Sequence, residues 1–370
     1  MILRLVALSG LGLAMLPVLV TLAAAEPDGA ILEPILVLQG HQRDIAAATF
    51  SADGSKVATA SSDKSARIWD AASGVSLLTL AGHEEGVAVV AFSADGRRVV
   101  TGSRDGTARV FDASTGATIH VLSGHATVVD AIAITRDGSR ILTGSYDNTA
   151  RLWDAATGTQ LAILSGHSEW VTGVYFSPDE TLILTISNDK TARLWSRDGA
   201  LLRTLAGHDG LLAAAQFTPD GRTIATASSD KSAKLWDVAT GRELATLGGH
   251  GRAVTAVAFS PDGAHVATGA SDKTIRLFDA ATGGLVRAIA NAHKRIIAVL
   301  RYSPDGRLLL SASHDKSARL WNAADGNLVA TMPTHTKEID AAEFSPDGTR
   351  LLTAALDGVA LIWKVPTRGE

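Results

Sequence analysis

Cysteine is absent from this 370-residue chain, and several other signals of specific chemistry are missing as well. Without a thiol there is no disulfide, no thiol nucleophile and no lipid attachment through an N-terminal cysteine. The sequence contains no Gly-x-Ser-x-Gly elbow, no phosphate-binding glycine loop ending in Gly-Lys-Ser/Thr, no His-Glu-x-x-His pair and no calcium-loop pattern. The familiar sequence signatures of hydrolases, nucleotide-binding proteins and metalloproteins are therefore missing.

The chain is also poor in aromatic residues and close to electrical balance. Phe, Trp and Tyr make up 5% of the residues, and 34 basic against 38 acidic side chains give a formal net charge of −4. No strongly basic stretch with interleaved aromatic residues occurs, so we expect no nucleic-acid partner. Only His120, His265 and His314 lie outside the repeat described next, and three scattered His residues make a weak metal site. We expect no metal and no cofactor.

A repeated spacing dominates what is present. Eight times a His is followed 22 residues later by an Asp and 28 residues later by a Trp or Phe, and a Ser or Thr stands four residues before each Asp. The eight quartets are His41, Thr59, Asp63 and Trp69; His83, Thr101, Asp105 and Phe111; His125, Thr143, Asp147 and Trp153; His167, Thr185, Asp189 and Trp195; His208, Thr226, Asp230 and Trp236; His250, Thr268, Asp272 and Phe278; His293, Ser311, Asp315 and Trp321; and His335, Thr353, Asp357 and Trp363. Successive His residues are 41 to 43 positions apart, a period that indicates a repeat architecture.

Each unit has the pattern of four short strands. An apolar residue four positions after the His and a large one nine positions after it, such as Val254 and Phe259, mark a first strand. A turn such as Ser260 to Gly263 follows, in which Pro presets φ and Gly supplies a positive φ. The second strand carries the Ser or Thr, the third ends near the Trp or Phe, and a fourth such as Leu77 to Leu80 completes the unit. Four strands in a repeat of this length predict the blade of a β-propeller.

On these residues the chain resembles the WD-repeat family of β-propellers, with Gly-His, Asp and Trp-Asp at the family's offsets over residues 35 to 364. The resemblance implies a buried network that joins the His, Ser/Thr, Asp and Trp of each unit. In units two and six, Phe111 and Phe278 keep the packing of the Trp but lose its indole N–H donor. We expect an all-β fold, an eight-bladed β-propeller of four-stranded antiparallel blades.

Ser/Thr, His and Asp are also the residue types of a catalytic triad. A quartet that occurs eight times in one register indicates a scaffold, because a catalytic site is normally made once. A buried network also has a structural reason, since a hydrogen bond contributes about 0.5–1.5 kcal/mol net and an orphaned buried partner costs about 1–3 kcal/mol. We therefore predict a structural network and no enzyme.

A basic residue recurs two positions before the Trp slot in seven of the eight units. We interpret it as a strand residue that packs over its neighbour or pairs with an Asp, not as part of a ligand-binding ring. The seven residues are Arg67, Arg109, Arg151, Arg193, Lys234, Arg276 and Arg319. Unit eight has Leu361 at this position, which the repeat pattern does not explain.

Ring closure decides the number of blades. After Trp363 only Lys364 to Glu370 remain, which is too short for a turn and a fourth strand. Residues 34–39, Pro-Ile-Leu-Val-Leu-Gln, resemble the fourth strands that precede the other His residues. We predict that this N-terminal strand completes blade eight, because pairing the two chain ends in one sheet leaves no open edge between the first and last blades.

The first 25 residues belong to a different kind of segment. Arg4 is their only charge, an apolar stretch runs from Leu5 to Leu22, and three Ala residues precede Glu26, which is the layout of a secretory signal peptide. An uncleaved N-terminal membrane anchor is the alternative, and Arg4 would place the propeller outside in either case. We predict a signal peptide or anchor at residues 1–25, a short linker at 26–34 and the propeller at 35–370. The predicted location is the periplasm or the cell exterior of a bacterium, with a tether to the inner membrane if the segment is uncleaved.

Residues that the eight units do not share are the candidates for a specific function. Six of the seven Trp residues belong to the repeat, and Trp170 does not. In the family fold its position, and the position before the turn Asp that holds Arg104, Tyr146 and His314, lie near the mouth of the central channel. Aromatic and Arg side chains on an exposed face are typical of interaction hot spots, so we predict that this patch receives a peptide or protein segment. The alternative is that Trp170 only covers the channel mouth beside apolar neighbours.

Three kinds of function remain open at this point. The first is a non-catalytic interaction module in the cell envelope that offers its loops around the channel to a protein partner. The second is a propeller that binds a small ligand or cofactor in the central channel, with or without enzyme activity. The third is a membrane-anchored structural spacer. The fold does not decide among them, because propellers host many activities.

Overall fold

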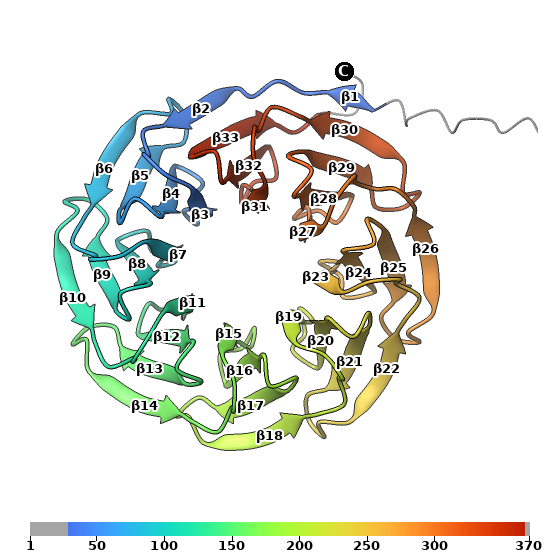
Figure 1. The fold of residues 1–370 in the computed structure, drawn as a ribbon, viewed down its shortest axis with the longest axis horizontal. Helices are drawn as coiled ribbons and strands as arrows, with labels where there is room; N and C mark the ends of the chain where they lie inside the picture. The colour runs from blue at the N-terminus through green and yellow to red at the C-terminus, as the bar shows by residue number, and fades with distance from the viewer. Residues whose placement is uncertain (1–28, 367–370) are drawn as a thin grey trace, which may run out of the picture.

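The computed structural model describes residues 29–366, and every element of regular secondary structure in that range is a β-strand. The strands form eight sheets, or blades, arranged in a ring about a common axis (Figure 1). The predicted fold class is thus confirmed. The predicted signal peptide at residues 1–25 lies outside the described residues.

Blades are numbered in chain order. Each contains four antiparallel strands, which follow one another from the ring axis to the outside of the ring. The first, innermost strands are β3 (Ile45–Phe50), β7 (Val87–Phe92), β11 (Val129–Ile134), β15 (Val171–Phe176), β19 (Leu212–Phe217), β23 (Val254–Phe259), β27 (Ile297–Tyr302) and β31 (Ile339–Phe344). The second strands are β4 (Lys56–Ser61), β8 (Arg98–Ser103), β12 (Arg140–Ser145), β16 (Leu182–Ser187), β20 (Thr223–Ser228), β24 (His265–Ala270), β28 (Leu308–Ser313) and β32 (Arg350–Ala355). The third strands are β5 (Ala66–Asp70), β9 (Ala108–Asp112), β13 (Ala150–Asp154), β17 (Ala192–Ser196), β21 (Ala233–Asp237), β25 (Ile275–Asp279), β29 (Ala318–Asn322) and β33 (Val359–Lys364). The fourth, outermost strands are β6 (Ser76–Leu80), β10 (Thr118–Leu122), β14 (Gln160–Leu164), β18 (Leu201–Leu205), β22 (Glu243–Leu247), β26 (Leu285–Ile289), β30 (Leu328–Met332) and, for blade eight, β2 (Leu36–Gln39).

The N-terminal strand β2 closes the ring as predicted. It pairs antiparallel with β33 and gives blade eight the order β2-β33-β32-β31, in which Leu38 lies opposite Ala360 (Figure 1). Leu38 is fully buried against Ile362 and against residues of blade one, so the closing strand contributes to the core as well as to the sheet.

The segment before β2 makes a second contact. Strand β1 (Ala30–Ile31) pairs in parallel with β30, the outermost strand of blade seven, and the backbone N–H of Leu32 donates to the carbonyl of Thr331 at 2.9 Å. Part of the predicted linker therefore adds a fifth strand to blade seven (Figure 1). Residues 30–39 run along the outside of two neighbouring blades and span the boundary between them.

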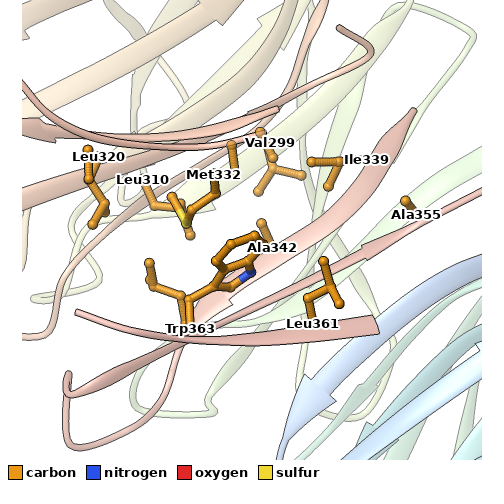
Figure 2. Packing of buried hydrophobic residues seen from close by; sticks show 13 residues of the cluster. Val299, Leu310, Leu320, Met332, Ile339, Ala342, Ala355, Leu361 and Trp363 are labelled. Carbon is orange, nitrogen blue, oxygen red and sulfur yellow. The ribbon is translucent and has the colours of Figure 1, made fainter. Parts of the chain in front are cut away.

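The hydrophobic core lies between successive blades. Between blades seven and eight, Trp363 packs against a cluster that includes Leu310, Leu320 and Met332 of blade seven (Figure 2). Similar clusters recur around the described part of the ring. Each blade thus covers the apolar face of the next, which is why a single blade has no complete core of its own.

Side chains also join blade eight to blade one. The Arg350 guanidinium donates to the carbonyls of Ala71 and Gly54 of blade one, each at 2.7 Å. The Glu343 carboxylate accepts the backbone N–H of Phe50, and burial raises the pKa of Glu343 above its usual value. The boundary at which the ring closes is therefore held by side-chain hydrogen bonds in addition to the β2–β33 pairing.

The exception at Leu361 is accompanied by a second change in the same unit. In most units the basic side chain two positions before the Trp slot lies against the Gly that precedes the His, and a Cβ on Gly82 would approach Arg109 Nη1 to 2.7 Å. Unit eight has Thr334 in place of this Gly. The same unit has Leu361, only 3% exposed, in place of the Arg, and Leu361 joins the core between blades seven and eight. In unit seven Ala292 replaces the same Gly, yet Arg319 is retained and donates to the carbonyl of Ala292 at 2.8 Å, so loss of the glycine alone does not account for Leu361.

Candidate functional site

The structure joins the four residues of each repeat into one hydrogen-bonded chain. In unit three, His125 Nδ1 lies 2.8 Å from Asp147 Oδ2, His125 Nε2 lies 2.8 Å from Thr143 Oγ1, and Trp153 Nε1 donates to Thr143 Oγ1 at 2.9 Å. The bond from His to Ser or Thr occurs in all eight units at 2.7–2.8 Å. The indole bond occurs in the six units that have a Trp.

Donors and acceptors in this chain match when the His is neutral and carries its proton on Nδ1. That proton is then donated to the Asp carboxylate, while Nε2 accepts from the Ser or Thr hydroxyl, which in turn accepts from the indole N–H. Burial is the main reason that the pKa of His125 lies below 6.5, although the bond to Asp147 opposes the shift. The arrangement positions no nucleophile toward solvent, because Thr143 is fully buried. The network joins the loop before the first strand to the second and third strands of the same blade.

The two units with Phe provide a matched comparison. Thr226 binds both His208 and the indole of Trp236, whereas Thr268 binds His250 and has Phe278 in the place of the Trp. We expect Thr226→Val to lower the free energy of unfolding by about 2–5 kcal/mol, because two buried partners lose a bond, and Thr268→Val by about 1–3 kcal/mol. Urea denaturation followed by circular dichroism measures the difference. Equal losses would show that the indole bond contributes nothing.

The four predicted partner-binding residues lie on the face of the ring that carries the His-containing loops, here called the His face. Tyr146 and Trp170 come together in a parallel stack with ring centroids 4.2 Å apart and planes 8° apart. Trp170 is 45% exposed, whereas the six Trp residues of the network are at most 2% exposed. The Tyr146–Trp170 stack therefore presents an aromatic surface to solvent.

The stack is anchored by a carboxylate on the innermost strand of blade three. The Tyr146 hydroxyl donates to Asp130 Oδ2 at 3.1 Å. Burial and the nearby charge of Asp130 raise the pKa of Tyr146 to about 12. Burial raises the pKa of Asp130, while the Tyr146 bond and the charge of Arg104 partly offset the increase. Arg104 is thus close enough to act on this cluster electrostatically.

His314 belongs to a separate cluster. Its Nε2 lies 3.1 Å from Asp340 Oδ1, and this bond is the main reason that the pKa of His314 is raised above 6.5. His314 follows β28 in blade seven and Asp340 lies on β31 in blade eight, whereas the stack is on blades three and four. The structure therefore brings together Tyr146 and Trp170, places Arg104 near them, and separates His314.

Asp130 and Asp340 are not among the predicted site residues, although the sequence contains a signal for them. They occupy the second position of the innermost strand, where the other units have Ala46, Ala88, Thr172, Ala213, Thr255 and Ala298. A comparison of the units at this position finds two carboxylates among small residues. The bonds to Tyr146 and His314 depend on the fold and are not visible in the spacing.

Two hollows lie on the His face. One, of about 370 Å³, is mainly apolar and is lined by residues of blades three to six, among them Asp130, Thr172, Leu211 and Ala253. The other, of about 480 Å³, is more polar and lies over blades eight, one and two, with Arg104 on its wall. Within residues 29–366 no cluster of His, Asp and Glu could hold a metal ion. The same range contains no helix long and apolar enough to cross a membrane.

Comparison with known proteins agrees with this geometry. The family described as WD domain, G-beta repeat matches the chain in eight segments, residues 32–70, 74–112, 116–154, 158–196, 199–237, 241–279, 285–322 and 326–364. The chain therefore belongs to the WD-repeat family, whose propellers commonly serve as protein-interaction scaffolds. The crystal structure of the computationally designed Ika8 protein is similar, with a TM-score of 0.81 and 28% sequence identity over 90% of this chain and 100% of that chain. No curated protein matches the chain.

Proposed function

We propose that this protein is a non-catalytic interaction module whose His face binds a segment of a protein partner at the Tyr146–Trp170 stack. The exposed Trp170 carries the proposal, because it is the Trp that the repeat does not use and its indole lies in a stack at the surface. A rigid aromatic pair buries a large area on binding at little cost in side-chain entropy. The ring of blades holds this pair in place before the partner arrives, which lowers the cost of binding further.

Site-directed photo-crosslinking tests this proposal. Leu211 on the His face is 46% exposed, and Leu161 on the outer strand β14 is 48% exposed, so a photoreactive phenylalanine at each position is equally accessible. We expect discrete crosslinked proteins from position 211 but not from position 161, and we expect Trp170→Ala and Arg104→Ala to reduce them. The same products from both positions, or products that neither substitution affects, would show that the patch is not the site.

We also propose that the protein works in the bacterial cell envelope, outside the inner membrane. The layout of residues 1–25, with one basic residue, an apolar stretch and three Ala residues before Glu26, supports export. N-terminal sequencing of the protein isolated from its native cells tests this proposal, and we expect a start at Glu26. A start at Met1 would favour the membrane-anchored spacer.

Metal analysis and a visible absorption spectrum of the same preparation test whether the protein instead binds a metal or cofactor. We expect neither a stoichiometric metal nor visible absorbance. A stoichiometric cofactor would favour the ligand-binding alternative.

A further inference from the structure

The apolar hollow on the His face contains a carboxylate, Asp130, that forms no ion pair with any residue in the described range 29–366. Asp130 lies on its wall, and the hydrogen bond that the side chain receives comes from the neutral hydroxyl of Tyr146. Asp340, the other carboxylate at this strand position, is paired with His314 instead. A carboxylate accepts about four hydrogen bonds through its two oxygens, so Asp130 retains capacity for a further donor.

The rest of the hollow suits an aliphatic chain. Leu211, Ala213 and Ala253 supply apolar surface around it, and Leu211 is 46% exposed. A side chain that matches this wall has an apolar stem and a cationic end, which describes arginine and lysine. Arginine fits better, because its planar guanidinium binds a carboxylate through two parallel bonds, is weakly hydrated and stacks on aromatic rings.

We propose that this hollow binds the side chain of an arginine in the partner segment, with the guanidinium on Asp130 and the methylene groups against the apolar part of the wall. The proposal rests on the proposed function and specifies the chemistry of the partner at the same site. The Tyr146–Trp170 stack holds Asp130 in place from one side and contacts the residues that flank the arginine. Arg104 lies on the neighbouring turn and is exposed, so it can turn toward solvent when the incoming cation binds.

Two short peptides that differ only in charge test the proposal. The probes are acetyl-Gly-Ser-Arg-Ser-Gly-amide and the same peptide with citrulline, which has nearly the shape of arginine but no charge. The full chain is labelled with 5-fluorotryptophan, and Trp170→Phe identifies the fluorine signal of Trp170 among the seven Trp residues. We expect the arginine peptide to shift this signal with an affinity at least about tenfold higher than that of the citrulline peptide.

Asp130→Asn removes the charge but keeps an acceptor for the Tyr146 hydroxyl, so the stack is retained. We expect this variant to bind both peptides with equal affinity, whereas the control Asp340→Asn keeps the preference for arginine. Equal binding of both peptides to the unmodified chain, an unchanged preference in Asp130→Asn, or no binding of the arginine peptide at all would overturn the proposal. The crosslinking result from position 211 is independent of these outcomes, so the proposed function can survive the failure of this one.

Discussion

Lowering the pH from 7 to 5 is expected to destabilise the propeller steeply. Seven network His residues have pKa values below 6.5 because they are buried. They bind protons less readily in the folded chain than in the unfolded chain, which takes up protons once the pH falls below about 6.5. Their contribution to stability is therefore complete above pH 6.5 and is lost as the pH falls below it. Each such His lowers the free energy of unfolding by at most about 1.4 kcal/mol per pH unit, and the seven contributions add.

A second loss follows at lower pH from the network carboxylates. Burial alone would raise their pKa values, but hydrogen bonds outweigh it and lower the pKa of Asp63, Asp105, Asp230 and Asp357 to about 2. The stability that they contribute is present above pH 3.8 and is lost as the pH falls toward 2. His314 has the opposite effect on the pH dependence of stability. Because its pKa is raised in the folded chain, its contribution to stability is lost as the pH rises through that pKa.

Urea denaturation at pH 7, 6 and 5 measures the first of these losses. Repeating the series in 0.5 M NaCl serves as the control, because salt screens exposed charges strongly and buried pairs much less. We expect the slope with pH to persist in salt. A free energy of unfolding that stays constant between pH 7 and 5 would show that burial does not lower the pKa values of these histidines.

Trp363→Ala is expected to lower the free energy of unfolding by about 3–5 kcal/mol, the usual cost of removing a large aromatic side chain from a core. Trp363 is fully buried between blades seven and eight and donates its indole N–H to Thr353 at 2.9 Å. The substitution removes apolar contacts on both sides of a blade boundary and also leaves a buried hydroxyl without its donor.

Trp170→Ala is the matched control, because it removes the same side chain from the surface. We expect a loss of about 1 kcal/mol or less, which corresponds to the stack on Tyr146. Guanidinium denaturation of the two variants gives the comparison. Similar losses at both positions would contradict the distinction between the tryptophans that are buried between blades and the one that faces solvent.

The sequence was sufficient to predict the ring because the same physical requirement recurs in every unit. A buried Thr such as Thr143 needs partners, so His125, Asp147 and Trp153 keep a fixed spacing that can be recognised without a structure. The closing strand was predictable for a related reason, since β2 repeats the apolar pattern of the other fourth strands.

Features that occur once in the ring, and not in every repeat, were less predictable from the sequence. Strand β1 has two residues, too few for any periodicity, and its pairing with β30 depends on where the closed ring places the N-terminal segment. Trp170 and Tyr146 could be selected because they depart from the repeat, but their stack depends on the spacing of blades three and four. The role proposed for Asp130 depends in turn on that stack and on the hollow beside it.

A disulfide introduced between β2 and β33 tests the closure of the ring most directly, because the natural chain has no cysteine. Val37 lies opposite Leu361 in the sheet, while Val359 is two residues further along β33 and points to the same side. Directly paired strand residues have Cα atoms within disulfide range, and residues two positions out of register do not. Mild oxidation followed by proteolysis and mass spectrometry should find the disulfide in Val37→Cys/Leu361→Cys but not in Val37→Cys/Val359→Cys. Formation in the second pair alone, or in neither, would contradict a ring closed by the N-terminal strand in this register.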